Sequence, residues 1–388
     1  MRILIPCFES RGHHLHFARL LCRAAEEIGC RPVLALPAGA SQGAEFRTWF
    51  GDRPGTEVVE PFGDHRPGSL LGAMRQARLV RGVLQQFRCD HAWIHWADGV
   101  AVGRLVAGIR DWGVPTEALF LRGRYAYPGA VSLRDRMAAA VAKAAIGAGE
   151  WESRWHLDPL CADFLRTRSL PVKRMPEPVE PMRDIARDAS RLRLGLPSSG
   201  TILGVLGSLD RRKGVIELLR AFARSGVRDL RLALLGKLDP DVAESVHGLA
   251  SRCPLGSVFI RDAVLTPDEF ADALAACDWH SVAYPRHFGS SGILVRAASI
   301  DRPVLASDFG WVGEATRRYG LGVTCDASSV DAIADRLRMI QERPEFAFGP
   351  LRDSFVRFNT EANFIAHWTA VVRTRLGLPS DQALFEFQ

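Results

Sequence analysis

Short apolar runs alternate along most of this chain with segments in which apolar residues recur at helical spacing. The first run covers residues 3–7, and a helical pattern then extends from about His14 to Gly29. Apolar runs of strand length that alternate with helical patterns are typical of parallel strands joined by helices. In the first half of the chain the pattern also predicts strands at residues 31–36, 91–95 and 117–121.

Residues 147–196 interrupt this alternation. Residues 170–178 contain three prolines and cannot continue a helix, so we place a domain boundary there. A second series then predicts strands at residues 202–206, 231–235, 258–260, 279–283, 304–306 and 322–325. We therefore predict an α/β protein with two doubly wound, Rossmann-like domains facing each other across a cleft. The predicted domains are residues 1–178 and 179–358, and a C-terminal helix within 359–388 crosses back to the N-terminal domain.

Length and charge narrow the class of protein. A chain of 388 residues is too long for one ordinary core, which agrees with two domains. The formal net charge of +6 favours an anionic ligand, nucleic acid or an anionic membrane surface. Nucleic-acid binding calls for a basic stripe interleaved with exposed aromatic residues, or for a known module. The sequence has neither, so we expect no nucleic-acid partner.

The cysteines and the N-terminus indicate a cytoplasmic protein. The eight cysteines form no Cys-x-x-Cys pair and no His/Cys ligand spacing, so we expect buried, reduced thiols and no metal site. The first apolar run is too short for the core of a signal peptide, and no run has the length needed to span a bilayer. We expect a cytoplasmic protein that is at most peripheral at the inner membrane face.

The stretch 284–298 combines the end of an apolar strand, a short loop and the start of a helix. The loop is Gly289-Ser290-Ser291-Gly292. At the N-terminus of a helix such a loop directs several backbone N–H groups toward one point, which suits a phosphate or another anion. An ordinary tight strand-to-helix turn is the alternative interpretation.

A second loop, at residues 207–214, carries three consecutive cations. Arg211, Arg212 and Lys213 follow the predicted strand 202–206 and precede a helix that begins near Val215. Ligands of doubly wound sheets bind at the carboxyl ends of strands, so cations there suit a phosphate group. A solvated basic turn is the alternative. Together, the two loops indicate a diphosphate held between them.

Two segments of the second half resemble the donor-binding segments of family-4 glycosyltransferases, which have the GT-B fold. The first runs from Gly207 through Arg212-Lys213-Gly214-Val215 to Phe222, and the second from Phe288-Gly289 through residues 303–308 to Glu314. The resemblance covers essentially the whole second domain and extends more weakly to the N-terminal strand–loop–helix. It implies transfer of a sugar, with retention, from a nucleotide-diphosphate sugar to a sugar, lipid-linked or small-molecule acceptor. The acceptor would bind the N-terminal domain and the donor the C-terminal one. No metal or other cofactor is expected, because positive side chains and helix dipoles offset the charge of the diphosphate.

The resemblance also implies roles for individual residues. The expected donor diphosphate site consists of Arg212, Lys213, Gly289, Ser290, Ser291 and Gly292, with Arg296 and Val264 on the nucleoside side. The candidate catalytic residues are His14, His287 and Arg122, and the candidate acceptor-side residues are Gly12, His13, His95 and Asp98. For His13 and His14, the alternative is that one of them only caps the helix. For Arg122, the alternative is an ordinary surface position.

The chain departs from the family pattern at the paired glutamates. These two residues usually stand eight positions apart, and aligning on Pro303-Val304 puts Phe288 and Arg296 at their places. Aligning on Phe288-Gly289 puts Arg286 at the first place instead, beside His287. The second glutamate normally holds the ribose of the donor. Because no glutamate stands at either place, we expect an active branch of the family that binds the donor through serine side chains and backbone groups instead. The alternatives are a catalytically silent, nucleotide-sugar-binding partner protein and a GT-B nucleotide-sugar epimerase.

The segment between His65 and Cys89 has no acidic residue. It carries Arg66, Arg75, Arg78, Arg81 and Arg88 beside a possible apolar stripe of Leu70, Met74, Ala77, Leu84 and Phe87. A basic amphipathic helix docks on anionic membranes, where many such transferases meet lipid-linked acceptors. Core packing with a solvated basic face is the alternative.

Overall fold

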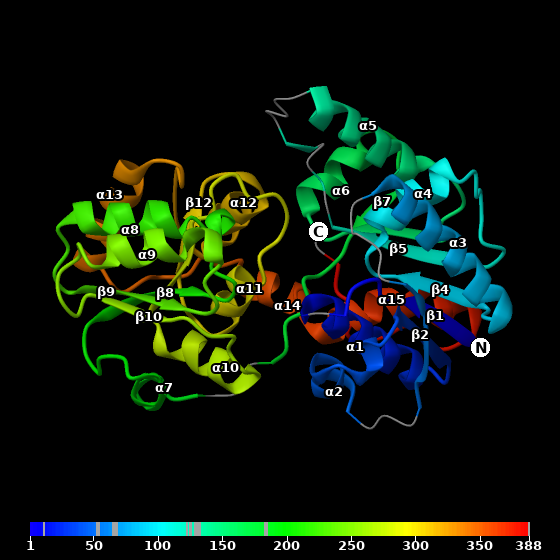
Figure 1. Ribbon diagram of the computed structural model, residues 1–388, viewed down its shortest axis with the longest axis horizontal. Coiled ribbons are helices and arrows are strands. Elements are labelled where there is room, and N and C mark those ends of the chain that lie inside the picture. Colours follow the sequence, from blue (N-terminus) through cyan, green and yellow to red (C-terminus); the bar gives the residue numbers. More distant parts are fainter. Residues whose placement is uncertain are drawn as a thin grey trace. The chain divides into compact units, whose positions relative to one another are not determined.

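The computed structural model describes residues 1–10, 12–51, 55–63, 69–121, 123, 126–127, 133–181 and 185–386, except for the side chains at 13, 134 and 135. The chain divides into two compact units (Figure 1). The first unit is Met1–Pro176 with Glu361–Glu386, and the second unit extends from Glu177 to Thr360. The sequence analysis placed these boundaries at 178 and 358.

The first unit contains a sheet of seven strands in the order β3-β2-β1-β4-β5-β6-β7, all parallel. In that order the strands are Glu57–Phe62, Arg31–Pro37, Arg2–Pro6, His91–Ile94, Thr116–Phe120, Ser153–His156 and Val172–Arg174. The helices are α1 (Gly12–Glu27), α2 (Ala44–Phe50), α3 (Leu70–Gln86), α4 (Ala97–Val106), α5 (Leu133–Gly147), α6 (Pro159–Arg166) and α15 (Glu361–Arg375), with a 3₁₀ turn, η1, at Ala40–Gln42.

Alternate residues of the strands supply two cores, one on each face of this sheet. Ile3 and Ile5 of β1 pack with α1, α2 and α15, whereas Leu4 between them packs with α3, α4, α5 and α6. This follows from the twofold alternation of side chains along a strand. Figure 1 shows the two helical layers on opposite sides of the strands.

The second unit contains a sheet of six strands in the order β10-β9-β8-β11-β12-β13, again all parallel. In that order the strands are Val258–Arg261, Leu230–Leu235, Thr201–Leu206, Trp279–Val282, Val304–Ser307 and Gly322–Cys325. The helices are α7 (Arg187–Leu194), α8 (Val215–Ser225), α9 (Pro240–Ala250), α10 (Pro267–Ala276), α11 (Gly292–Ser299), α12 (Gly310–Tyr319), α13 (Val330–Glu342) and α14 (Arg352–Phe358), with a 3₁₀ turn, η3, at Arg211–Lys213. Helices α8, α9 and α13 cover one face and share a core with the strands.

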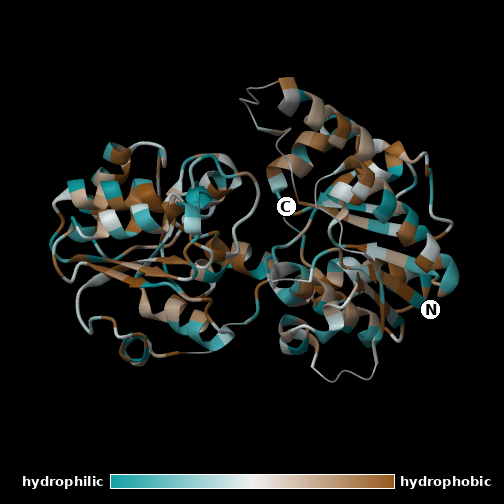
Figure 2. Ribbon diagram, in the orientation of Figure 1, coloured by the Kyte–Doolittle hydropathy of each residue, from teal (hydrophilic) through white to brown (hydrophobic). Residues whose placement is uncertain are grey.

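Figure 2 shows the strands of both units as the most hydrophobic elements, with hydrophilic residues on the outer faces of the helices. This is the pattern from which the sequence analysis predicted parallel sheets. The expectation that the alternation stops at residue 147 is wrong, because β6, α6 and β7 continue it to Arg174. Strand β6 reads Ser-Arg-Trp-His and β7 reads Val-Lys-Arg, so neither has an apolar run. Strand β3 was also missed; it lies at a sheet edge with largely exposed side chains.

Helix α15 packs against α1 through a buried carboxylate. Glu361 is 6% exposed, and its oxygens lie 3.6 Å from His16 Nε2 and 3.6 Å from Arg23 Nη1. The aromatic rings of Phe364 and Trp368 belong to the same core as α1. Helix α15 is therefore part of the first unit's core.

Two further expectations concern cysteines and membranes. All eight cysteines are buried and unbridged, as the sequence analysis predicted.

In α3 the buried residues are Ala77, Val80, Val83 and Leu84, and they face α4. Leu70 and Leu71 are exposed, as are the nearby Arg75, Arg78 and Arg81. Among the described residues, no helix is long and apolar enough to cross a membrane.

Candidate functional site

The candidate site of the second unit lies where strand order reverses. Strands β8 and β11 are neighbours in the sheet although β9 and β10 lie between them along the chain, and the sheet extends in opposite directions from this pair. Ligands of doubly wound sheets bind at such a switch point, beyond the carboxyl ends of the strands. The loops that leave these two ends are residues 207–214 and 283–291, the loops that the sequence analysis selected.

The two loops are in direct contact at Gly214. This residue has φ = 65°, and a Cβ there would lie 2.6 Å from the Ala283 carbonyl oxygen and 2.8 Å from Pro285 Cδ. A side chain would therefore meet backbone as well as strain. Glycine at this position lets the basic loop pack against the loop that follows β11.

Lys213 points inward at the carboxyl end of β8. It is 7% exposed, and its ammonium donates to the Leu206 carbonyl and lies 5.6 Å from the centroid of the Tyr284 ring. Asp210 fixes the turn by accepting the Lys213 N–H at 3.1 Å. Burial, with some repulsion from Arg212, lowers the pKa of Lys213 to about 8. The site thus holds one buried cation that is partly desolvated before any ligand binds.

Ser291 connects Tyr284 to helix α11. Its Oγ caps the helix by accepting the Leu294 N–H at 3.5 Å, and the Ser291 side chain lies near the Tyr284 hydroxyl. Burial raises the pKa of Tyr284 to about 12, so this hydroxyl keeps its proton. Lys213, Tyr284 and Ser291 therefore form a continuous line from the first loop to the second. The hydroxyl of Ser291 acts here as a helix cap, and its predicted contact with phosphate stays a prediction.

His287 lies within the second loop beside these groups. Its Nε2 is 3.0 Å from the Ser290 carbonyl oxygen, and its ring meets that of Tyr284 edge-on at 5.3 Å. Because a carbonyl oxygen only accepts, Nε2 carries the hydrogen and Nδ1 is the acceptor nitrogen. Burial lowers the pKa of His287, and the charges of Arg212 and Lys213 act in the same direction. The imidazole is therefore neutral at neutral pH.

The turn before α11 contains two residues with positive φ. Gly289 has φ = 105°, and the preceding turn includes Arg286 at φ = 50°. The N–H groups of Gly292 and Ile293 belong to the first turn of α11, so they have no acceptor within that helix. A helix N-terminus of this kind attracts negative charge.

The structure adds Glu177, which sequence reasoning missed. Glu177 is 8% exposed, and its side chain lies near those of Ser290 and Arg296. Burial raises the pKa of Glu177, while Arg296 and Ser290 oppose that shift. A Cβ on Gly292 would lie 2.6 Å from Arg296 Nη1 and 3.6 Å from Glu177 Oε1, so all these groups surround the start of α11. Nothing in the local sequence, Pro176-Glu177-Pro178, indicates that this side chain reaches the start of α11.

Other predicted residues of this unit lie nearer the surface. The Arg212 side chain is 50% exposed and lies 3.4 Å from Asp210 Oδ2. Val264 is 80% exposed in the loop after β10. Arg296 donates to the Gly292 carbonyl at 3.3 Å and lies 5.8 Å from the Phe270 ring centroid. Their contacts with a nucleotide stay predictions.

In the first unit, His14 lies on the first turn of α1. Its ring stacks on Trp96 with 3.7 Å between centroids, and its Nε2 is 3.7 Å from Glu9 Oε2. The Gly12 N–H donates to Glu45 Oε2 at 2.9 Å, so this amide already has an acceptor.

The other acceptor-side candidates are close to the ends of β4 and β5. His95 is fully buried, and burial, together with the neighbouring His14, lowers its pKa to about 3. Asp98, in the first turn of α4, accepts the Leu121 N–H at 3.1 Å. His14, His95 and Trp96 thus gather at the carboxyl end of this sheet. Arg122 and the side chain of His13 lie outside the described residues.

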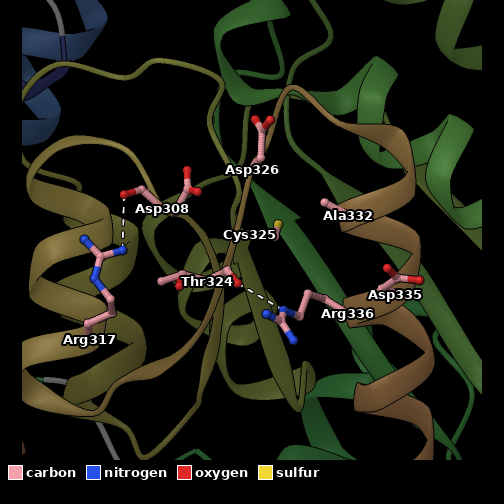
Figure 3. Close-up of a pocket in the computed structure, with 8 residues that line it drawn as sticks. All are labelled: Asp308, Arg317, Thr324, Cys325, Asp326, Ala332, Asp335 and Arg336. Atoms are coloured by element: carbon pink, nitrogen blue, oxygen red, sulfur yellow. Dashed lines mark hydrogen bonds between the residues drawn. The ribbon is translucent and has the colours of Figure 1, made fainter. Parts of the chain in front are cut away.

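A separate cavity of about 430 Å³ opens beyond β12 and β13 (Figure 3). Figure 3 shows Asp308 and Asp326 on the loops that leave these strands and an arginine on each side. Arg317 donates to the Asp308 carbonyl at 3.2 Å and Arg336 to the Thr324 carbonyl at 3.0 Å. None of the residues that line this cavity belongs to the predicted site.

Comparison with known proteins supports the fold assignment. No protein-family model matches this chain. A D-inositol 3-phosphate glycosyltransferase from Rhodococcus opacus (strain B4) is 28% identical over 166 residues, which span 41% of this chain and 37% of that relative. Among solved structures, sucrose-phosphate synthase from Thermosynechococcus elongatus aligns with a TM-score of 0.77 at 16% identity, over 97% of this chain and 99% of that one.

Two further structures share the fold at lower similarity. HepE from Anabaena, solved with UDP and glucose, has a TM-score of 0.68 at 16% identity over 97% of this chain and 100% of its own. A UDP-GlcNAc 2-epimerase from Neisseria meningitidis has a TM-score of 0.57 at 12% identity, over 97% of this chain and 100% of its own. The chain has the GT-B fold of glycosyltransferases, with two Rossmann-like α/β domains, and the predicted fold class is confirmed.

Proposed function

We propose that this protein is a glycosyltransferase that takes a sugar from a nucleotide-diphosphate sugar bound to the second unit. The observation that carries the proposal is the meeting of two loops at the β8/β11 switch point. One loop supplies the buried cation of Lys213, and the other supplies the N-terminus of α11. A diphosphate needs both kinds of group, since each charge-assisted contact adds about 1.5–3 kcal/mol. The similarity to a curated glycosyltransferase and to a structure solved with UDP supports this choice of ligand.

In the proposed reaction the bond between the anomeric carbon and the diphosphate oxygen breaks. A new bond forms from that carbon to an acceptor hydroxyl, whose proton passes to the departing diphosphate oxygen. The departing diphosphate gains negative charge, which Lys213, Arg212 and the first-turn amides of α11 stabilise. His287, neutral and adjacent to this charge, is the basic group that we assign to the donor side. We propose retention of anomeric configuration and no metal or cofactor requirement.

We assign the acceptor to the first unit. His14 and Asp98 lie at the carboxyl end of that sheet, with His95 buried beside them, and a sugar, lipid-linked or small-molecule acceptor would find these polar groups near the Trp96 ring. We further propose a cytoplasmic location with peripheral contact at the inner membrane face through the exposed arginines of α3.

A ligand screen tests this proposal. Thermal unfolding with UDP, GDP, ADP and TDP should show stabilisation by one of them, since a ligand that binds the folded state raises its stability. The matching nucleotide sugars, incubated without acceptor, then separate three outcomes. Slow hydrolysis to the nucleoside diphosphate supports a transferase. Conversion to a different nucleotide sugar would indicate an epimerase, and binding without turnover would indicate a catalytically silent partner protein.

A further inference from the structure

Tyr284 is a buried aromatic residue that contacts two groups of the proposed donor site. It lies in the loop after β11 and is 2% exposed. The Lys213 ammonium lies over its ring, 5.6 Å from the centroid, and the His287 ring meets it at 81° with 5.3 Å between centroids. One side chain therefore contacts both the cation of the first loop and the imidazole of the second, although the proposed reaction gives it no role.

The surroundings of the Lys213 ammonium fix the direction of its three N–H donors. One of them donates to the Leu206 carbonyl at the end of β8. Gly207 leaves room for this contact, since a Cβ there would lie 3.2 Å from Lys213 Nζ. The Tyr284 ring faces the ammonium from the other loop and attracts it through its quadrupole. Among the described residues these two contacts engage two of the donors, which leaves the third for an anion.

The groups around Lys213 leave its charge available to a ligand. Asp210 accepts the Lys213 backbone N–H with Oδ1, and its Oδ2 lies 3.4 Å from Arg212, so both carboxylate oxygens are already engaged. His287 is neutral, and burial raises the pKa of Tyr284 to about 12, so neither adds negative charge at neutral pH. A carboxylate in place of the ring would compete with phosphate for the ammonium, whereas the ring attracts the cation and leaves its charge intact.

We propose that Tyr284 is a positioning residue of the donor site, whose ring holds the Lys213 ammonium charged and directed at the diphosphate. Tyr284 acts on the ligand through Lys213 and makes no contact of its own with the reacting atoms. The His287 ring, with Nε2 at 3.0 Å from the Ser290 carbonyl oxygen, braces the tyrosine ring from within the same loop. This inference rests on the proposed function.

The test measures the binding of UDP and of uridine to the whole protein by titration calorimetry, with the pair changed to another base if the ligand screen selects one. Tyr284→Leu removes the ring and should weaken UDP binding by about five- to thirtyfold, the range for a desolvated cation over a ring, with little change for uridine. It should also move the loss of UDP affinity to lower pH, because the ring favours the charged form of the ammonium. Tyr284→Phe, which keeps the ring, should restore most of the affinity and the pH profile.

Tyr319 provides a matched control in the same unit. It is also 2% exposed and has a cation, Arg318, at 5.6 Å from its ring centroid, but it is the last residue of α12. Tyr319→Leu should lower stability and leave UDP affinity and its pH profile unchanged. In the Lys213→Met background the ring has no ammonium to hold, so Tyr284→Leu should there change UDP affinity by less than about twofold.

A graded series keeps the test independent of folding effects. Phenylalanine, difluorophenylalanine and trifluorophenylalanine at position 284 have nearly the same shape, while the ring quadrupole weakens with each added fluorine. UDP affinity should fall in that order, and the pH at which it is lost should fall with it.

Two groups of results would contradict different statements. An equal loss for UDP and uridine, an equal loss with and without Lys213, or no order in the fluorinated series would show that Tyr284 only supports the fold of its loop. This inference would then be wrong while the donor site stands. If the wild-type protein binds none of UDP, GDP, ADP and TDP, it is the proposed function that fails.

Discussion

The ammonium of Lys213 lies over the ring of Tyr284, 5.6 Å from its centroid, and this contact joins the loop after β8 to the loop after β11. The Tyr284 hydroxyl continues the connection to the N-cap of α11 through Ser291. A cation over an aromatic face is stabilised by the ring quadrupole. The ring therefore stabilises the positive charge at the switch point and leaves it unneutralised. An acidic partner would neutralise it.

Binding of a nucleoside diphosphate should weaken as pH rises above 8. The pKa of Lys213 is lowered to about 8, so its charge is present below that pH and is lost above it. A bound anion favours the protonated form, so binding near pH 8.5 should take up a proton. Calorimetry in two buffers of different ionisation enthalpy measures this uptake. The matching nucleoside, which lacks phosphate, should show no uptake at the same pH.

The same pKa predicts a pH effect on the unliganded protein. In the unfolded chain Lys213 returns toward 10.5, so between about 8 and 10.5 the unfolded state binds more protons than the folded state. The contribution of Lys213 to stability should therefore rise with pH across this window. Lys213→Met should lack this rise, so the difference in unfolding free energy between wild type and variant should grow with pH, measured by urea denaturation at pH values from about 7 to 10.

Lys213→Ala should weaken nucleoside diphosphate binding by about 1.5–3 kcal/mol, the value of one charge-assisted contact. Binding of the nucleoside alone should change little. Arg220→Ala, an exposed cation on α8 of the same unit, is a matched control. An equal loss for nucleoside and diphosphate would mean that Lys213 does not contact phosphate.

Gly214→Ala should destabilise the second unit far more than the same change at Gly226. Both glycines have positive φ, 65° and 71°, so both substitutions carry a similar backbone strain. Only at Gly214 would the new Cβ meet backbone, 2.6 Å from the Ala283 carbonyl oxygen, whereas nothing lies within 4 Å at Gly226. The difference between the two changes in unfolding free energy measures the contact of the two loops. Equal losses would show that the loops separate without cost.

Gly292→Val should abolish diphosphate binding while the protein still folds. The added Cβ would lie 2.6 Å from Arg296 Nη1, a flexible side chain that can shift, so folding survives. The branched side chain would then cover the first-turn amides of α11. Gly248→Val in α9, with nothing within 4 Å of its Cβ, is the control for the loss of a helical glycine. Retained binding in Gly292→Val would place the diphosphate elsewhere.

Ser291→Ala should lower stability by about 1 kcal/mol, the usual contribution of a helix N-cap. Ser329, which caps α13 by accepting the Ala332 N–H at 3.2 Å, provides a comparison remote from the two loops. Ser329→Ala should cost a similar amount and leave ligand affinity unchanged. We expect Ser291→Ala in addition to weaken nucleotide binding modestly, measured by titration. Loss of affinity without loss of stability would show that this hydroxyl serves the ligand rather than the helix.

The sequence by itself determined the parallel sheets and the two loops of the candidate site. Apolar runs, helical spacing and glycine-rich turns are local properties, and the carboxyl ends of parallel strands necessarily lie at one edge of a sheet. That is why the sequence was enough to select Lys213 and the Gly289–Gly292 loop as candidates. Strands β6 and β7 were missed because their burial comes from neighbours in the sheet and not from an apolar run of their own.

Only the tertiary structure decided which distant side chains meet. Glu177 and Arg296 lie more than a hundred positions apart in the sequence, and a boundary segment between two prolines gives no local sign that its carboxylate reaches the start of α11. Likewise, it is burial that lowers the pKa of Lys213 to about 8, and the residue type alone does not indicate this shift. Charge compensation and desolvation depend on three-dimensional neighbours, so no pattern of spacing along the chain contains them.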